Sequence, residues 1–359
     1  MERMRKLRAD IAHHDSAERF SKELGVDVYL GWGKFTSPNT IEVNGKTLRF
    51  KRAVVASGAR AAVPPIEGLE AVPYLTNANV FNLTARPGRL LVVGFGPIGL
   101  ELAQCFARFG SQVTVVGRRD KILPKEDRDA AEIVYQSMLK DGMEFIFNCT
   151  FLRFEHTPPP PPPGDGGDGE TRFGTVRLRL EERGKEGVRV LEADALLLGT
   201  GRRPNVEGKE EEGEGRGLTF CRGRSARRCC GGVQVGDHLR FQQPAVFAVG
   251  DCCTRYQFTH AADFMARLVL RNALFPLGRA RFSALLVPWC TFTAPGGGPR
   301  GPVPGGPGGP GRAVRDLPEE LRGGGPRRGG GGDRGLRQGS LQEGHRHNPG
   351  RHCRGAARG

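Results

Sequence analysis

The sequence predicts an α/β fold, and three observations support this prediction. Residues 89–119 have the pattern of a strand, a glycine-rich turn, a helix and a second strand. Apolar runs of strand length recur at 53–56, 195–198 and 245–249. Helical patterns separate such runs, at 128–140 and 260–274. This alternation is typical of a mostly parallel sheet that is covered by helices.

The first quarter of the chain predicts one helix and several short strands. The charged segment 1–25 is expected to be a helix that ends near Gly25. Short strands are expected at 26–29, 40–43 and 47–50, with an Asn44–Gly45 turn joining the last two. The run at 53–56 predicts a fully buried strand that Ser57 and Gly58 stop.

Three glycines follow the strand expected at 90–93. Gly94, Gly96 and Gly99 have the GxGxxG spacing, and each has a physical reason. These reasons are a tight turn, close approach of the backbone to a pyrophosphate, and close packing of a helix on a strand. In this context the spacing predicts a dinucleotide-binding βαβ unit. The alternative is a glycine-rich turn that only packs a helix.

The helix after this turn is expected to bury one face. Its apolar residues recur at spacings of four, four and three, at Ile98, Leu102, Phe106 and Phe109. Gly110 is expected to end the helix, and 113–116 to form a buried strand.

The segments after residue 119 include both predicted elements and stretches that are expected to lack a fold. The pattern predicts a helix over 128–140 and strands at 144–148 and 195–198, and the alternation over 175–181 predicts an edge strand. The Pro- and Gly-rich insertion at 158–169 is expected to be a surface loop between two strands. The segments 207–232 and 294–359 are expected to lack a fold, because they carry too little apolar surface to offset the entropy of ordering.

Composition limits the function classes. The net charge is +15, of which the tail after Thr293 carries +7, so the rest is ordinary for a protein that handles anionic cofactors. No apolar stretch reaches the length of a membrane helix, and no signal peptide is visible. The nine cysteines form no CxxC or CxxxxC pair, which favours a reduced, intracellular setting, cytoplasmic or organellar.

Three further motifs flank the glycine unit: VVASGAR at 54–60, GTGRRPN at 199–205 and VFAVGDC at 246–252. With it, they make the chain resemble the pyridine nucleotide-disulfide oxidoreductase family (class I), over about 1–206 and 233–293. The sequences at 49–69 and 287–293 are similar to those of the mercuric-reductase-like branch. The resemblance implies two interleaved Rossmann-like domains, one for FAD and one for NAD(P).

This resemblance implies a division of the chain. Residues 1–87 are expected to be a partial FAD-binding domain without its first βαβ unit, and 88–206 the NAD(P)-binding domain. Residues 207–280 are expected to return to the FAD-binding domain, and 281–359 to hold a remnant of the interface domain and a disordered Gly/Pro/Arg tail. The family's first GxGxxG, its redox CxxxxC and its C-terminal His–Glu pair are not found in this sequence.

The family's nicotinamide site maps onto named positions. The resemblance implies that Gly94, Gly96 and Gly99 hold the nucleotide and that the backbone of Gly201 passes close to it. Glu101 matches the glutamate at the contact of flavin and nicotinamide, and so is a tentative catalytic residue. The alternative for Glu101 is a partly buried helix acid.

The family's FAD site maps onto two other motifs. Asp251, after Gly250, matches the aspartate that binds the ribityl hydroxyl of FAD. Its alternative is an N-cap for the next helix. Ala56, Ser57 and Gly58 match the turn that runs near the FAD.

The end of the second strand of the glycine unit bears on the choice of nicotinamide cofactor. An NAD-selective site places an acidic residue there, but this chain has Gly117 followed by Arg118 and Arg119. Guanidinium groups suit a 2′-phosphate, so NADP(H) is expected rather than NAD(H). The alternative is a solvated pair of surface arginines.

The resemblance implies hydride transfer from NAD(P)H to FAD, and on to a small-molecule, disulfide or metal-ion acceptor, in a family of homodimers. Because the redox motifs are not found, impaired activity is expected. A non-catalytic NADP(H)-binding module is the alternative function. Nucleic-acid binding by the Arg/Gly tail is disfavoured, because the tail has no aromatic residues for base stacking. No metal site is assigned.

Overall fold

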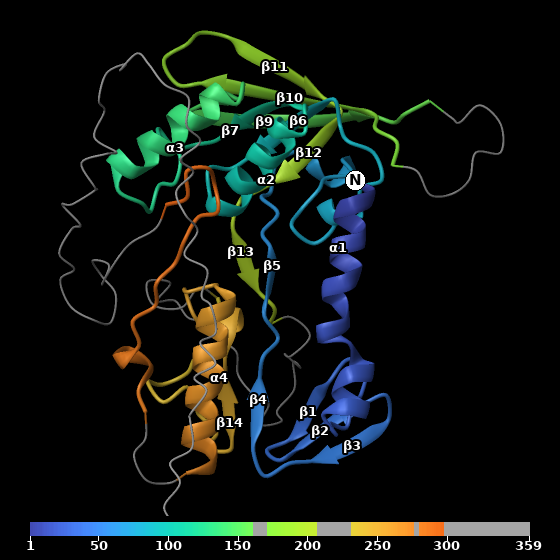
Figure 1. Ribbon diagram of the computed structural model, residues 1–359, viewed down its shortest axis with the longest axis vertical. Coiled ribbons are helices and arrows are strands. Elements are labelled where there is room, and N and C mark those ends of the chain that lie inside the picture. The colour runs from blue at the N-terminus through green and yellow to red at the C-terminus, as the bar shows by residue number, and fades with distance from the viewer. Residues whose placement is uncertain (161–170, 207–230, 276–279, 298–359) are drawn as a thin grey trace, which may run out of the picture. The chain divides into compact units, whose positions relative to one another are not determined.

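The computed structural model describes residues 1–160, 171–206, 231–275 and 280–297 (Figure 1). Its architecture is α/β, as the sequence predicts. The longer helices are α1 (Glu2–Ala12), α2 (Pro97–Arg108), α3 (Arg128–Lys140) and α4 (Thr259–Leu274). Short helical turns lie at Leu69–Ala71, Val80–Asn82 and Phe282–Ala284. No helix of the described residues has both the length and the apolar composition that crossing a membrane requires.

A four-stranded parallel sheet with the order β12-β6-β7-β8 is the core of the glycine unit. Its strands are β6 (Arg89–Val93), β7 (Gln112–Val116), β8 (Glu144–Ile146) and β12 (Ala195–Leu198). The runs expected at 90–93, 113–116 and 195–198 are confirmed as strands. The strand expected at 144–148 is two residues shorter.

Alternate residues of β6 pack on opposite faces of this sheet. Leu90 and Val92 belong to the apolar cluster of α2 and α3, whereas Leu91 and Val93 belong to a cluster with a second sheet. All four are at most 1% exposed. Figure 1 shows the corresponding layers, with α2 and α3 on one side and β9–β11 on the other. Burial on both faces explains why these strands are continuously apolar.

The second sheet is an antiparallel meander with the order β11-β10-β9. Its strands are β9 (Cys149–Thr157), β10 (Thr175–Glu182) and β11 (Val188–Ala193). The alternation of β10 buries Val176, Leu178 and Leu180. The prediction of an edge strand is wrong, because β10 pairs on both sides. The 158–169 insertion does connect two strands, but residues 161–170 lie outside the described residues.

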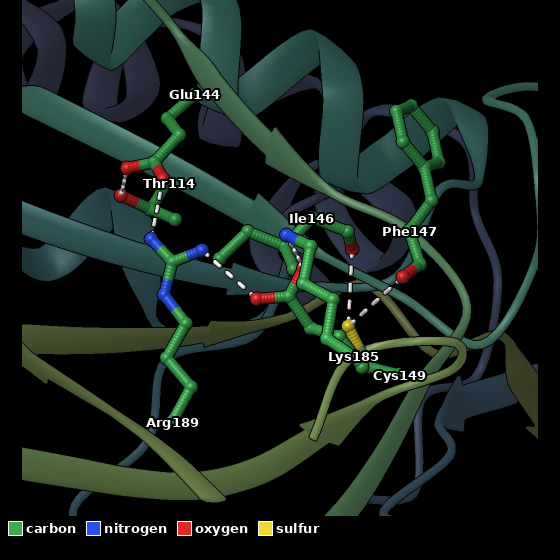
Figure 2. Close-up of polar contacts among 8 residues, drawn as sticks. Thr114, Glu144, Ile146, Phe147, Cys149, Lys185 and Arg189 are labelled. Atoms are coloured by element: carbon green, nitrogen blue, oxygen red, sulfur yellow. Dashed lines mark hydrogen bonds and ion pairs between the residues drawn. The ribbon is translucent and has the colours of Figure 1, made fainter. Parts of the chain in front are cut away.

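Ion pairs tie the meander to the parallel sheet (Figure 2). Arg189 of β11 lies 2.7 Å from Glu144 of β8 and 3.0 Å from Glu182 of β10. Lys185 lies 2.5 Å from Glu182. Hydrogen bonds from Lys185 and Arg189 hold the pKa of the Glu182 carboxyl below its ordinary value. Beside this cluster the Cys149 thiol donates to the carbonyl of Ile146 at 3.2 Å.

Helix α2 ends as predicted but buries a different face. Gly110 has a φ of +93°, and its amide and that of Ser111 close a Schellman motif on Ala107 and Phe106. The expected face is wrong, because Phe109 is 56% exposed and Ile98 and Leu102 are only partly buried. The close approach of Gly99 to the sheet turns the helix, so that its buried residues are Gly99, Leu100, Ala103, Gln104 and Phe106.

The strands that resemble the family's flavin-binding region are less buried than those of the four-stranded parallel sheet. Here β4 (Ala53–Val55) and β14 (Val246–Ala248) form a two-stranded parallel sheet. The run at 53–56 is confirmed as a strand, but the expectation of full burial is wrong because Val54 is 48% exposed. Its side of the strand has no covering layer among the described residues, whereas Val55 on the other side is 7% exposed. Helix α4 packs on the β14 side through Met265 and Val269.

The N-terminal elements depart most from expectation. The single helix expected over 1–25 is wrong: α1 ends at Ala12, and separate turns follow at His13–Asp15 and Arg19–Glu23. No residue of α1 is buried, so no tertiary packing stabilises a longer helix. Ser16 starts a new turn, because its hydroxyl accepts the Arg19 amide at 3.1 Å in the manner of an N-cap.

A three-stranded antiparallel sheet follows. Its strands are β1 (Lys34–Ser37), β2 (Thr40–Val43) and β3 (Lys46–Arg49), in the order β1-β2-β3. The strand expected at 26–29 is wrong, and β1 takes its place. The expected turn is confirmed: Asn44 and Gly45 both have positive φ, 49° and 77°, as a two-residue hairpin turn requires.

Two segments expected to lack a fold fall mostly outside the described residues. Of the predicted segments 207–232 and 294–359, residues 207–230 and 298–359 lie outside the described residues. The described residues 294–297 do make specific contacts, because Thr291 pairs with Gly297 and Ala294 bonds to α2 and α3. The expected end of order at Thr293 is therefore a few residues early.

Candidate functional site

The glycine turn joins β6 to α2. Gly94 has a φ of +115°, and a Cβ there would lie 2.4 Å from the carbonyl oxygen of Gly199. A Cβ on Gly199 would lie 2.7 Å from the Cα of Gly99. Only glycines therefore fit this turn and this helix contact.

Gly96 precedes α2, and its extended backbone leads into Pro97 at the first helical position. Because proline has no N–H, the first turn of α2 offers the amides of Ile98 and Gly99 to a ligand. An anion at this end would also be favoured by the helix dipole.

Gly117 lies at the end of β7, where an acidic residue would select NAD. A Cβ at this position would meet the Phe95 ring at 2.4 Å. Phe95 is 4% exposed, and its ring packs on Phe147 with the centroids 4.9 Å apart, so it cannot move aside freely. The Phe95 ring therefore occupies the space that an acidic side chain would need.

The two arginines after Gly117 lie in different surroundings, although both are exposed. The Arg118 guanidinium lies over the Phe151 ring, 5.6 Å from its centroid. It also lines a cavity of about 600 Å³, together with Arg183 and Lys185 and with Glu181 and Glu182 of the meander. Arg119 is not part of this lining; its carbonyl accepts the Asn148 amide at 3.0 Å.

Glu101 lies on α2 and faces the segment after α4. Its carboxylate accepts the amide of Phe292 at 2.8 Å. Burial raises the pKa of the Glu101 carboxyl, and the bond from Phe292 opposes that rise. One turn further along α2, Gln104 exchanges two hydrogen bonds with the backbone of Ala294, at 2.8 and 3.1 Å. The segment 292–294 thus lies along the helix that carries Glu101.

The turn at Ala56, Ser57 and Gly58 meets the end of the GTGRRPN motif. The Ser57 hydroxyl donates to the Asn205 carbonyl at 2.8 Å, and the Asn205 amide donates to Gly58 at 2.9 Å. The adjacent strands β5 (Ala59–Ala61) and β13 (Arg202–Pro204) pair antiparallel. Two motifs about 145 residues apart in the sequence are therefore joined in space.

Open space lies beside this junction. Gly58 and Gly201 both have positive φ, at 66° and 109°, and a Cβ on either would meet no atom within 4 Å. The backbone at both positions could therefore be approached closely by a ligand.

Asp251 lies in the short helical turn Gly250–Cys252 after β14. Its Oδ2 lies 3.0 Å from Nη2 of Arg202, which also donates to the Ala59 carbonyl at 3.0 Å. Burial raises the pKa of the Asp251 carboxyl, and the charge of Arg202 opposes that rise. The buried Nε of Arg202 has no hydrogen-bond partner among the described residues.

The alternative that Asp251 caps the next helix is wrong. Helix α4 begins at Thr259, its N-cap position is Phe258, and no side chain caps it. Asp251 is instead one member of an ion pair that crosses from β14 to the GTGRRPN motif.

The motif geometry agrees with a comparison against known families. The family model of pyridine nucleotide-disulphide oxidoreductases matches residues 5–266. The chain belongs to this family. The family resemblance drawn from the four motifs is confirmed.

Individual relatives agree with this assignment. The chain is 30% identical to the mercuric reductase of Bacillus cereus over 278 residues, which cover 76% of this chain and 39% of that protein. It is 29% identical to the dihydrolipoyl dehydrogenase of Acholeplasma laidlawii over 266 residues, or 73% of this chain and 69% of that protein. The chain spans only 39 to 45% of the mercuric reductases of Bacillus cereus, Lysinibacillus sphaericus and Staphylococcus aureus.

A solved structure shares the fold. The HOCl-induced flavoprotein disulfide reductase RclA from Escherichia coli matches with a TM-score of 0.66 at 24% identity. The match covers 81% of this chain and 61% of RclA.

Two residues of the site were not anticipated from the sequence. Phe95 stands between two motif glycines, and no pattern indicates that its ring reaches Gly117. Arg202 lies inside the GTGRRPN motif, which signals its importance but not its partner Asp251. Both contacts join residues far apart in the chain, so local spacing cannot reveal them.

Proposed function

We propose that this chain binds NADP(H) on the β6–α2–β7 unit, as part of an FAD-dependent oxidoreductase. In this proposal hydride passes from the nicotinamide to FAD, and electrons pass on to a disulfide or a metal ion. Family membership supports the reaction class. The observation that supports NADP(H) over NAD(H) is the Phe95 ring at Gly117. This ring leaves no room for the acidic side chain that would bind an NAD ribose.

Arg118 and Arg119 would supply the positive charge for the 2′-phosphate. Arg118 is the better placed, since it faces a cavity that Arg183 also lines; of the other charged residues in the lining, Lys185 is paired with Glu182 at 2.5 Å. A phosphate held there would receive charge-assisted hydrogen bonds. Gly94, Gly96 and Gly99 would bring the pyrophosphate to the amides of Ile98 and Gly99 at the start of α2.

The residues at the β4–β14 junction fit the FAD that the family implies. Bound there, FAD would accept a hydride and release electrons singly or in pairs. Asp251 has Oδ1 left to accept a ribityl hydroxyl, because Arg202 takes Oδ2. The unpartnered Arg202 Nε is a further donor beside it. Ala56, Ser57, Gly58 and Gly250 would shape the adjoining turn, and Gly201 leaves open space.

Glu101 is the residue that we assign to the contact of the two cofactors. It is half-buried, and it fixes the Phe292 amide on α2. We therefore propose that it positions the segment 292–294 along the nicotinamide site. The domain boundaries at 87, 206 and 280 are part of this proposal.

A non-catalytic NADP(H)-binding module is the second candidate. One observation favours it: the sheet of the glycine unit is covered on both faces, whereas Val54 in the flavin-like strand β4 is 48% exposed. A well-packed nucleotide site beside a partly covered flavin site would bind one cofactor firmly and the other weakly.

Anaerobic mixing of the purified chain with NADPH and FAD distinguishes these candidates. The oxidoreductase predicts that NADPH bleaches the visible absorbance of bound flavin. The module predicts that NADPH binds, measured by its fluorescence, while the flavin stays oxidised. Failure of both nicotinamide nucleotides to bind would contradict both candidates. Arg118→Ala is expected to weaken NADPH binding. The Arg271→Ala variant, which removes an exposed arginine on α4, is its charge-matched control.

A further inference from the structure

The Arg118 guanidinium has an aromatic neighbour on the meander. It lies over the Phe151 ring of β9, 5.6 Å from the ring centroid. A cation in this position is attracted by the negative charge on the face of the ring. Phe151 is itself partly buried, and it packs against the apolar cluster that includes Phe154 and Leu180. Arg118 therefore rests on a ring that the meander anchors.

An aromatic partner differs from a carboxylate in what it leaves free on the guanidinium. A carboxylate would neutralise the charge and accept the N–H groups, whereas a phenyl ring is not a conventional hydrogen-bond acceptor. Within the part of the chain that the structure describes, the Arg118 side chain makes no ion pair and no hydrogen bond. Its charge and its N–H groups are therefore available to an anion.

The wall around Arg118 contains acidic residues, but these do not pair with it. Arg118 and its aromatic neighbour line the same cavity of about 600 Å³, together with Glu181 and Glu182. Both carboxylate oxygens of Glu182 are already paired, one with Lys185 at 2.5 Å and the other with Arg189 at 3.0 Å. Glu181 is exposed and forms no ion pair with Arg118. The ring is thus the partner that holds the guanidinium at this cavity.

We propose that Phe151 is a positioning residue for NADP(H), which holds the Arg118 guanidinium where it binds the 2′-phosphate. This role rests on the proposed function, in which Arg118 supplies positive charge for that phosphate. A side chain that is already held loses less conformational entropy on binding, so the affinity for the phosphate is higher. NADH has no 2′-phosphate, and its binding does not depend on Phe151. The meander thus contributes to the choice of cofactor.

The test measures the dissociation constants of NADPH and NADH by calorimetry on the full chain. Phe151→Leu keeps an apolar side chain but removes the ring. It is expected to weaken NADPH binding about threefold, the size expected for the loss of a cation–π contact near the surface, and to leave NADH binding unchanged. Phe151→Tyr keeps a ring and is expected to bind NADPH as tightly as the unmodified chain.

A double-variant cycle separates positioning from general support of the fold. In the Arg118→Ala background no guanidinium is left to hold, so adding Phe151→Leu is expected to leave NADPH binding unchanged. The matched control is Phe145→Leu, because Phe145 is also partly buried but packs on Tyr135 and Phe147 and does not line the cavity. It is expected to leave both dissociation constants unchanged. Thermal unfolding checks that each variant is folded.

The proposal is overturned if Phe151→Leu binds NADPH as tightly as the unmodified chain, or if it weakens NADH binding equally. It is also overturned if the effect of Phe151→Leu persists in the Arg118→Ala background. The proposed function has a separate readout, since it requires the unmodified chain to bind NADPH more tightly than NADH. If that preference is present and Phe151→Leu retains it in full, the positioning role fails and the proposed function stands. If the unmodified chain lacks the preference, the proposed choice of cofactor itself fails.

Discussion

The glycine unit and the flavin-like region around β4 and β14 differ in how fully they are packed. The glycine unit has a four-stranded parallel sheet between two helices and a meander, and the apolar residues of its central strands β6 and β7 are at most 3% exposed. The flavin-like region has a two-stranded sheet, and Val54 stands half exposed on one of its strands. A family motif and a fully packed sheet are therefore separate properties. Both regions carry family motifs, but only the first is enclosed on both faces by described residues.

The largest expected effect separates these two sheets directly. Leu91→Ala should lower the free energy of unfolding by about 3 to 5 kcal/mol, because Leu91 is 1% exposed in a packed cluster and leaves a cavity. Val54→Ala should lower the free energy of unfolding by less than about 0.5 kcal/mol, as substitutions at other surface positions do. Urea unfolding of both variants measures this. Equal costs would contradict the proposed difference in packing.

The glycines of the two regions provide the next comparison. Gly94→Ala and Gly201→Ala both place a side chain at positive φ, but only the first collides with another backbone. Gly94→Ala should lower the free energy of unfolding by about 2 to 3 kcal/mol and weaken NADPH binding. Gly201→Ala should lower the free energy of unfolding by about 1 kcal/mol. Thermal unfolding and NADPH titration of the pair test this. If Gly201→Ala proved the more damaging, our account of the turn would be wrong.

A smaller, pH-dependent effect is expected at the ion pairs of the meander. The pKa of Glu182 is lower in the folded chain, so its bonds to Lys185 and Arg189 stabilise the fold above its unfolded pKa. This stability is lost as the pH falls through the folded pKa. Glu182→Gln should therefore lower the free energy of unfolding by about 1 kcal/mol at about pH 7, and by progressively less as the pH falls through the folded pKa.

The control for Glu182 is its neighbour on β10. Glu181→Gln removes an exposed carboxylate that makes no ion pair within the described part of the chain. The free energy of unfolding of this variant should match that of the parent at neutral and at acid pH. A cost for Glu182→Gln that persists at low pH would show that the ion pairs are not its cause.

Local patterns in the sequence predicted much of the glycine unit. The bounds of α3 agree with the expected helix over 128–140, and the buried strands at β6, β7 and β12 follow from their apolar runs. The break in the N-terminal helix at Ser16 was missed, because charged helical composition masks a capping residue.

Other features could not be predicted because distant segments determine them. Gly99 turns α2 by packing on Gly199, a hundred residues away, which changes its buried face. The exposure of Val54 depends on which layers cover β4, and an apolar run does not reveal this. The same holds for the Phe95 ring at Gly117, the contact on which the proposed preference for NADP(H) rests.

We propose that the glycine unit selects NADP(H), and the ratio of the dissociation constants for NADH and NADPH tests this selection. We expect calorimetry on the intact chain to give NADPH at least a tenfold advantage, since charged hydrogen bonds contribute about 1.5 to 3 kcal/mol. The double variant Arg118→Ala/Arg119→Ala should bring the ratio towards one and leave NADH affinity unchanged. Equal or tighter binding of NADH by the unmodified chain would contradict the account.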